Sequence, residues 1–107
     1  MQHKNLTKKR WSNFTLFEQL GNIGIEVTRA INAKTKEDKK LAGYRALELL
    51  DLTLLDNKFK TKNGRYEITR AREVVCDYLF CNNEYKSTKD SLEKYFMNFA
   101  IAARLNK

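Results

Sequence analysis

The sequence predicts an all-α protein, an up-down-up-down four-helix bundle with a basic N-terminal tail. Three observations lead to this prediction. The chain has no proline and four glycines, so that long helices can run without interruption. Apolar residues recur at intervals of three and four in several separate segments. At 107 residues, the chain is long enough for one hydrophobic core and too short for two.

The first predicted helix begins at Thr15, which forms a capping box with Glu18. Its apolar residues then follow at spacings of four and three: Leu16, Leu20, Ile23, Val27, and Ala30 or Ile31. Gly21 and Gly24 lie inside this helix, although each costs about 1 kcal/mol relative to alanine. We interpret them as points where a neighbouring helix approaches closely; contact of the backbone with a ligand is the alternative.

The second predicted helix spans residues 36–55 and is rich in leucine. Leu47, Leu50 and Leu54 form its expected inward seam, while other leucines point in other directions and make the helix apolar on more than one side. Residues 56–64 then break the period and end in Asn63-Gly64, a dipeptide typical of turns.

The third predicted helix runs from Arg65 to about Phe80 and is the segment around which the chain is organised. Its core face has a spacing of three and four: Ile68, Ala71, Val75 and Leu79. Charged residues, among them Arg72 and Asp77, occupy the rest of its circumference.

The fourth predicted helix is capped by Ser87 or Thr88 and ends near Leu105. Its inward stripe consists of Leu92, Phe96, Phe99 and Ala103. Other side chains spread apolar surface well beyond that stripe, and one bundle covers only one broad face of a helix. We therefore expect a homo-oligomer whose interface includes Tyr95, Met97 and Ile101.

These elements define a flexible basic tail at residues 1–13 and a bundle domain at residues 14–107. We expect an intracellular, cytoplasmic protein, because no apolar run is long enough to span a bilayer and no secretion signal follows the basic N-terminus. Cys76 and Cys81 are interpreted as free thiols. His3 is the one histidine, so the sequence offers no zinc site, no His-based catalytic pair and no reason to expect a cofactor.

The net charge of +8 favours a polyanion or an acidic protein as the partner. The up-down topology gathers the N-terminal tail, the connection between the second and third helices, and the C-terminus at one end of the bundle. We call this end the basic pole; its basic residues are Lys4, Lys8, Lys9, Arg10, Lys58, Lys60, Lys62, Arg65, Arg104 and Lys107. The acids expected there are Glu18, Asp56 and Glu67. At the opposite end, lysines and acids nearly cancel.

A one-sided basic pole predicts binding of RNA or DNA more strongly than net charge does. The predicted nucleic-acid contacts are Lys8, Lys9, Arg10, Trp11, Lys58, Phe59, Lys60, Lys62 and Arg65. Trp11 and Phe59 either stack on unpaired bases or plug the open end of the bundle. A solvated lysine-rich surface without a ligand is the alternative for the whole pole.

Four charged residues fall at similar heights near the middle of the bundle: Glu26, Arg45, Asp77 and Lys94. If they face inward, they form a paired polar layer, because an unpaired buried charge is costly. If they face outward, they are simply solvated.

The helix lengths and the third-helix sequence RYEITRAREVVCDYL resemble two groups of small prokaryotic bundles. Ribonucleases of the HEPN group carry an Arg, a polar residue, three further residues and a His; here Arg72 and Glu73 match, but Asp77 stands at the histidine position. The stretches GNIGIEVTRAIN, YRALELLDLT and NNEYKSTKDSLEKYF look like those of an uncharacterised bacterial bundle family, similar to Avd-like proteins. The Avd-like resemblance implies a basic, oligomeric, non-catalytic partner of nucleic acids.

Three functional hypotheses follow. The first is a non-catalytic accessory protein that binds nucleic acid, with RNA the favoured ligand, through the basic pole. The second is a protein-interaction subunit, an accessory or neutralising partner recognised through the apolar fourth helix. The third is a HEPN-type ribonuclease, which the missing histidine disfavours because Asp77 is an anion at neutral pH and repels phosphate.

Overall fold

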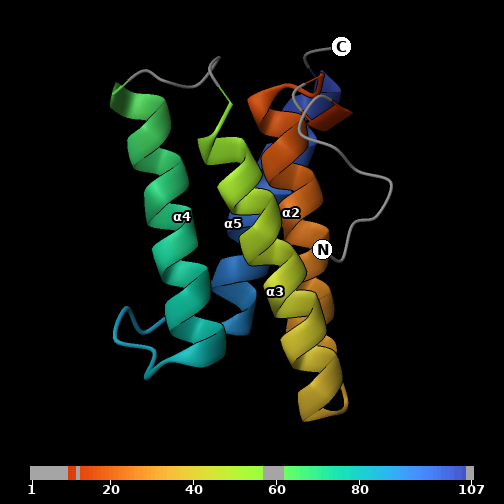
Figure 1. The fold of residues 1–107 in the computed structure, drawn as a ribbon, viewed down its shortest axis with the longest axis vertical. Coiled ribbons are helices and arrows are strands. Elements are labelled where there is room, and N and C mark those ends of the chain that lie inside the picture. Colours follow the sequence, from red (N-terminus) through yellow and green to blue (C-terminus); the bar gives the residue numbers. More distant parts are fainter. Residues whose placement is uncertain (1–9, 12, 57–61, 106–107) are drawn as a thin grey trace.

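The computed structural model describes residues 10–11, 13–56 and 62–105, without the side chains of Lys62 and Asn63. Its helices are α2 (Leu16–Asn32), α3 (Lys36–Leu54), α4 (Lys62–Phe80) and α5 (Lys89–Leu105), and no described residue lies in a strand. Successive helices run in opposite directions (Figure 1). The predicted all-α four-helix bundle is therefore confirmed.

Side chains at the helix N-termini satisfy backbone N–H groups that have no partner inside the helix. The predicted capping box is present: Glu18 N–H donates to Thr15 Oγ1 at 3.1 Å, and Thr15 N–H donates to Glu18 Oε1 at 2.9 Å. At the start of α5, Ser91 N–H donates to Thr88 Oγ1 at 3.0 Å. Of the two predicted caps, Thr88 is thus the one used.

The core lies around α2, which makes its most extensive contacts with α3 and α5, while α4 packs mainly on α3. The predicted inward faces of α2 and α4 are confirmed apart from Leu16 in the first turn of α2, which is half-buried. The other predicted residues are buried: Leu20, Ile23, Val27, Ala30, Ile68, Ala71, Val75 and Leu79. On α5, Leu92 and Phe96 are buried, whereas Phe99 and Ala103 are half-buried. The inward stripe of α5 is therefore deepest in its first half.

The inward face of α3 differs from the predicted leucine seam. Leu50 is buried as expected, but Leu47 and Leu54 are half-buried, and the other buried positions are Ala42, Gly43, Ala46, Leu49 and Thr53. Small residues face the neighbouring helices because they allow close approach; a Cβ added at Gly43 would lie 2.6 Å from Phe80 Cζ of α4. In a helix that is apolar on several sides, leucine spacing alone does not identify the inward direction.

The start of α4 also differs from the prediction. The helix begins at Lys62 rather than Arg65, and the expected Asn63-Gly64 turn lies within its first turn. Asn and Gly interrupt a helix interior, but near an N-terminus they are tolerated, because the first N–H groups lack helical partners anyway. The dipeptide therefore accompanies the start of a helix instead of a loop.

Gly21 and Gly24 are sites of close helix packing, as predicted. A Cβ added at Gly21 would lie 3.1 Å from the Cα of Ala100, and one added at Gly24 would overlap the Cβ of Phe96. Both neighbours are on α5. The glycines thus set the distance between α2 and α5.

We predict that Gly24→Ala destabilises the protein although alanine favours helix. Relief of the overlap requires α5 to move, because the clashing Phe96 Cβ is next to the backbone. Overpacking costs about 1–3 kcal/mol and outweighs a gain of about 1 kcal/mol in helix propensity. We expect a net loss of up to about 2 kcal/mol in the free energy of unfolding, measured by urea denaturation.

The control is Asn98→Ala at an exposed position of α5, which reports the propensity gain alone. A Gly24→Ala protein at least as stable as the wild type would show that α2 and α5 are not held at this distance by Gly24.

Candidate nucleic-acid interface

The basic pole is the end of the bundle at which α2 and α4 begin and α3 and α5 end (Figure 1). Arg65, in the first turn of α4, Arg10 and Arg104 are exposed. Of the other predicted contacts, Lys8, Lys9, Lys58, Phe59 and Lys60 lie outside the described residues, as does the side chain of Lys62. The structure therefore brings together the helix ends at this pole and describes three of its cations, Arg10, Arg65 and Arg104.

The predicted acids of the pole take part in the fold itself. Glu18 belongs to the capping box of α2. Asp56 is buried, and its Oδ2 accepts a hydrogen bond from Gln19 Nε2 at 3.3 Å. Glu67 accepts a hydrogen bond from the hydroxyl of Tyr95, which joins α4 to α5. Each acid thus has a structural role besides its contribution to the local charge.

Trp11 is a core residue, so it does not make the predicted contact with nucleic acid. Its side chain is 3% exposed, and its Nε1–H donates to Thr53 Oγ1 at 2.9 Å. A buried indole has no free face on which a base could stack. The alternative interpretation, that Trp11 closes this end of the bundle, is correct, and the packed region therefore begins before residue 14.

A buried polar cluster that sequence analysis did not identify holds Trp11 in place. Gln19 Nε2 donates to the carbonyl of Trp11 at 3.0 Å, and Thr53 Oγ1 donates to the carbonyl of Leu49 at 3.0 Å. Gln19 and Thr53 are fully buried. The available signal was their position: each polar residue lies at an inward site of an apolar helix, where it requires a hydrogen-bond partner.

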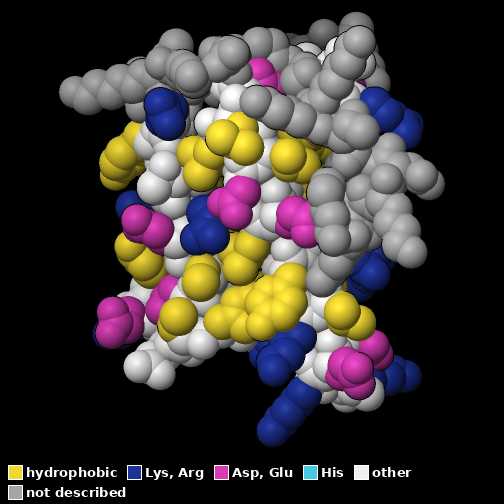
Figure 2. Space-filling view, in the orientation of Figure 1, with side chains coloured by type: hydrophobic (Ala, Val, Ile, Leu, Met, Phe, Trp, Pro, Cys, Tyr) yellow, Lys and Arg dark blue, Asp and Glu magenta, His cyan; other side chains and the backbone are white. Residues whose placement is uncertain are grey.

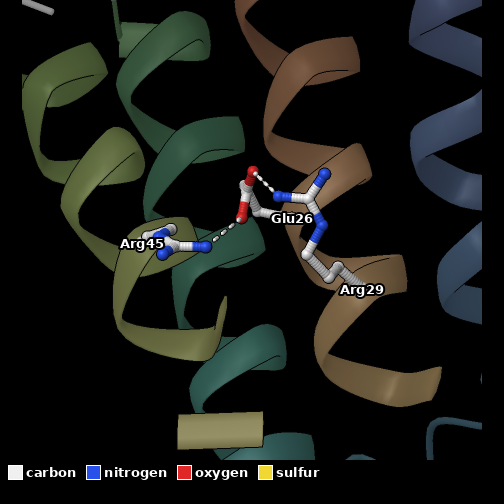
Figure 3. A network of polar contacts seen from close by, with 3 residues as sticks. All are labelled: Glu26, Arg29 and Arg45. Carbon is white, nitrogen blue, oxygen red and sulfur yellow. Dashed lines mark hydrogen bonds and ion pairs between the residues drawn. The ribbon is translucent and has the colours of Figure 1, made fainter. Parts of the chain in front are cut away.

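The predicted mid-bundle layer exists only in part. Figure 3 shows Glu26 of α2 between Arg29 of the same helix and Arg45 of α3, at 3.0 Å and 4.0 Å respectively. Lys94 is exposed. Asp77 lies elsewhere: its two carboxylate oxygens accept backbone N–H groups of the loop that follows α4. The layer is thus one ion-pair network between α2 and α3.

Arg72 and Asp77, the positions compared with the HEPN motif, have different partners. Arg72 Nε donates to Asp51 Oδ1 of α3 at 2.7 Å, and this bond raises the pKa of the guanidinium. Asp77 Oδ1 and Oδ2 accept from the N–H groups of Glu84 and Tyr85 at 2.9 Å and 3.1 Å. The Asp77 side chain is 8% exposed, and its carboxylate caps the loop that follows α4 instead of joining the mid-bundle layer.

The three predicted interface residues of α5 do not share one environment. Met97 and Ile101 are exposed, whereas Tyr95 is half-buried and bonded to Glu67. Burial and this hydrogen bond raise the pKa of the Tyr95 hydroxyl, which therefore remains a donor. Tyr95 belongs to the α4–α5 contact, and Met97 and Ile101 remain available to a partner.

A groove of about 220 Å³ lies between α4 and α5. Its apolar lining comes from Ala71, Val74, Leu92 and Phe96, and its polar lining includes Arg70 and Tyr85. The Tyr85 hydroxyl donates to Glu73 at 3.0 Å, which raises the pKa of that tyrosine. This groove is away from the basic pole and contains none of the predicted nucleic-acid contacts.

The face of α3 and α4 toward the viewer in Figure 2 mixes basic, acidic and hydrophobic side chains. No helix in the described part of the chain is both long and apolar enough to cross a membrane. Within residues 10–11, 13–56 and 62–105, no three His, Cys, Asp or Glu side chains are grouped to hold a metal ion.

Comparison of the chain with protein-family profiles, curated proteins and solved structures found no match. The resemblance to Avd-like and HEPN-type bundles therefore stays a prediction.

We predict that Asp77→Asn destabilises the protein. Asparagine keeps one acceptor oxygen but places an NH₂ group against a backbone N–H, so one buried hydrogen bond is lost. The expected decrease is about 1–3 kcal/mol in the free energy of unfolding, measured by urea denaturation. Glu84→Gln, at an exposed residue of the same loop, is the control and should change stability by less than about 0.5 kcal/mol. Equal stability of the two variants would contradict the loop-capping role.

We predict that nucleic acid leaves the fluorescence of Trp11 unchanged. Trp11 is the one tryptophan of the chain, so its emission reports a single buried site. The measurement is a titration with single-stranded RNA at low salt, with binding followed independently by anisotropy of labelled RNA. Strong quenching that follows the binding curve would show that the indole contacts bases after all. Emission of the urea-unfolded protein serves as the reference for an exposed indole.

Proposed function

We propose that this protein is a non-catalytic, nucleic-acid-binding helical bundle that contacts phosphates through its basic pole. The observation that carries the proposal is the arrangement of helix ends: the start of α2, the end of α3, the start of α4 and the end of α5 share one end of the molecule (Figure 1). In the sequence, Lys58 and Lys60 stand between the end of α3 and the start of α4. Lys8 and Lys9 stand just before Trp11, whose indole bonds to Thr53 of α3.

Charge distribution supports the same function. The acids Glu18, Asp56 and Glu67 at the pole are fewer than its basic residues and are held by hydrogen bonds within the fold. At the opposite end, Lys36 and its neighbouring lysines share the first turns of α3 with Glu37 and Asp38. A polyanion would consequently be attracted to one end of the bundle, where lysine and arginine can replace the counterions of its phosphates.

The positions of Arg72 and Asp77 support a non-catalytic role. Cleavage of RNA at the 2′-hydroxyl requires an acid, a base and a cation around one phosphate. Arg72 is bound to Asp51, and both oxygens of Asp77 are occupied by backbone N–H groups. A ribonuclease would need to release both residues from these partners and bring them together.

A second function, as a protein-interaction subunit, is favoured by the exposed apolar side chains of Met97 and Ile101 on α5. It is compatible with the first because neither residue is among the predicted nucleic-acid contacts. The two functions differ in their response to salt. Nucleic acid that co-purifies and is lost at high salt supports the first, and a protein complex that resists high salt supports the second.

We predict that replacing Lys58, Lys60 and Lys62 together by glutamine flattens the salt dependence of binding. Each lost phosphate contact reduces the slope of log K against log salt by about 0.7–0.9, so three contacts contribute about 2–3. The measurement is fluorescence anisotropy with a single-stranded RNA and a DNA of matching sequence at several salt concentrations. The comparison of the two ligands establishes which nucleic acid is preferred.

The matched control replaces Lys34, Lys36 and Lys40, three exposed lysines at the opposite end, by glutamine. It removes the same charge and should leave the slope unchanged. Equal slopes in the two triple variants would show that attraction depends on net charge and not on the pole. Absence of binding by the wild type at low salt would exclude the proposed function.

A further inference from the structure

Four residues of α5 form a seam on its outer side, distinct from the inward stripe of Leu92 and Phe96. They are Glu93, Met97, Ala100 and Arg104, at spacings of four, three and four. This is the spacing of a helix face that packs against another helix. Met97 is 53% exposed, and Arg104 is also exposed. Glu93 and Ala100 are half-buried, and Ala100 lies against Gly21 of α2, so the seam runs along the edge of α5 next to α2 and is partly open to a partner.

The surface beside this seam is hollowed and apolar. Two hollows of about 270 and 370 Å³ follow the line between α2 and α5 and share Gly21, Ile25 and Ala100 in their linings. Ile25 is 55% exposed, and Ile101 at the edge of the seam is 41% exposed. Gly21 and Ala100 leave space next to the exposed side chains of Ile25 and Met97.

We propose that a second copy of this chain covers this surface, with its α5 antiparallel to the first about a two-fold axis. The seam is complementary to the same seam of a second copy that runs in the opposite direction. The midpoint between Met97 and Ala100 is also the midpoint between Glu93 and Arg104. An antiparallel pairing centred there places Met97 opposite Ala100 of the other copy and Glu93 opposite Arg104 of the other copy, each match occurring twice.

Size and charge are both matched in this pairing. A flexible methionine side chain fills irregular space well, and the hollow beside Ala100 and Gly21 offers such space. Glu93 and Arg104 lie about 8 Å from the two-fold axis along the helix, at 1.5 Å per residue. Two ion pairs thus flank an apolar centre, the usual arrangement of a polar rim around an interface core.

The charge of the rest of the molecule explains why this surface suits a second copy. With a net charge of +8, two chains repel each other over most of their surfaces. Among the residues that line the two hollows, Arg104 is the one basic side chain, and Glu18 and Glu93 are acidic. Two copies can therefore approach along α5 with little repulsion between the apposed surfaces.

The dimer extends the proposed function without depending on it. Antiparallel pairing of α5 places the two basic poles at opposite ends of the assembly. A dimer would then present two separated cationic surfaces to one nucleic acid, which raises avidity through effective concentration.

Exchange of the two charged residues tests the pairing. Glu93→Arg and Arg104→Glu each place like charges opposite one another twice, and each should weaken dimerisation about tenfold or more. The combined variant reverses both ion pairs and should restore the wild-type dissociation constant. The measurement is sedimentation from nanomolar to submillimolar protein, with a fluorescently labelled fraction at low concentration, after removal of nucleic acid at high salt.

Lys94→Glu is the matched control, because it makes the same charge change as Arg104→Glu at an exposed position of α5 outside the seam. It should leave the dissociation constant within about twofold, and circular dichroism should show unchanged helicity in all variants. A wild-type protein that stays monomeric or assembles beyond two copies would overturn the proposal. So would a combined variant as weak as either single reversal. All of these readings are made without nucleic acid, so failure of the proposed function would leave them unaffected.

Discussion

The close contact between Gly24 of α2 and Phe96 of α5 constrains the rest of the bundle. Because Gly24 has no side chain, α5 approaches until Phe96 reaches the core. α2 holds α3 as well, so the contact fixes α5 relative to most of the fold. Turning Phe96 inward also directs Met97 outward, beside Ile25. The same small residue that closes the core thus creates the exposed surface between α2 and α5.

The end of the bundle at the basic pole depends on buried hydrogen bonds instead of close helix packing. Trp11 is joined to Thr53 of α3 and to Gln19 of α2, and Gln19 also contacts Asp56. Polar groups without partners would be costly inside a core, but these bonds satisfy many of their donors and acceptors. The cluster ties the chain before α2 to the end of α3. The position of the pole is therefore a consequence of core structure as well as of topology.

Much of the fold could be predicted because the inward faces of α2 and α4 follow a simple helical period, as Ile23 and Val75 illustrate. The inward face of α3 could not, because leucines point in several directions and the deciding residues are small. Gly43 is inward because Phe80 must fit against it, which depends on the position of α4. The start of α4 was missed for a related reason: the meaning of Asn63-Gly64 depends on whether a helix has already begun.

For the candidate site too, local sequence patterns predicted some features, and long-range contacts determine the others. Topology was sufficient to predict which helix ends lie at the pole, but Trp11 bonds to Thr53, which is 42 residues away in the sequence, and no local pattern indicates that pairing. Asp77 likewise bonds to a loop that its helical period does not describe. The seam of α5 shows the opposite case. The spacing of Glu93 and Arg104 is visible in the sequence, but it acquires meaning only once packing against α2 determines which side of α5 faces outward. Only then does it matter that the seam matches a second copy running in the opposite direction, because two copies can pair only through residues that face outward.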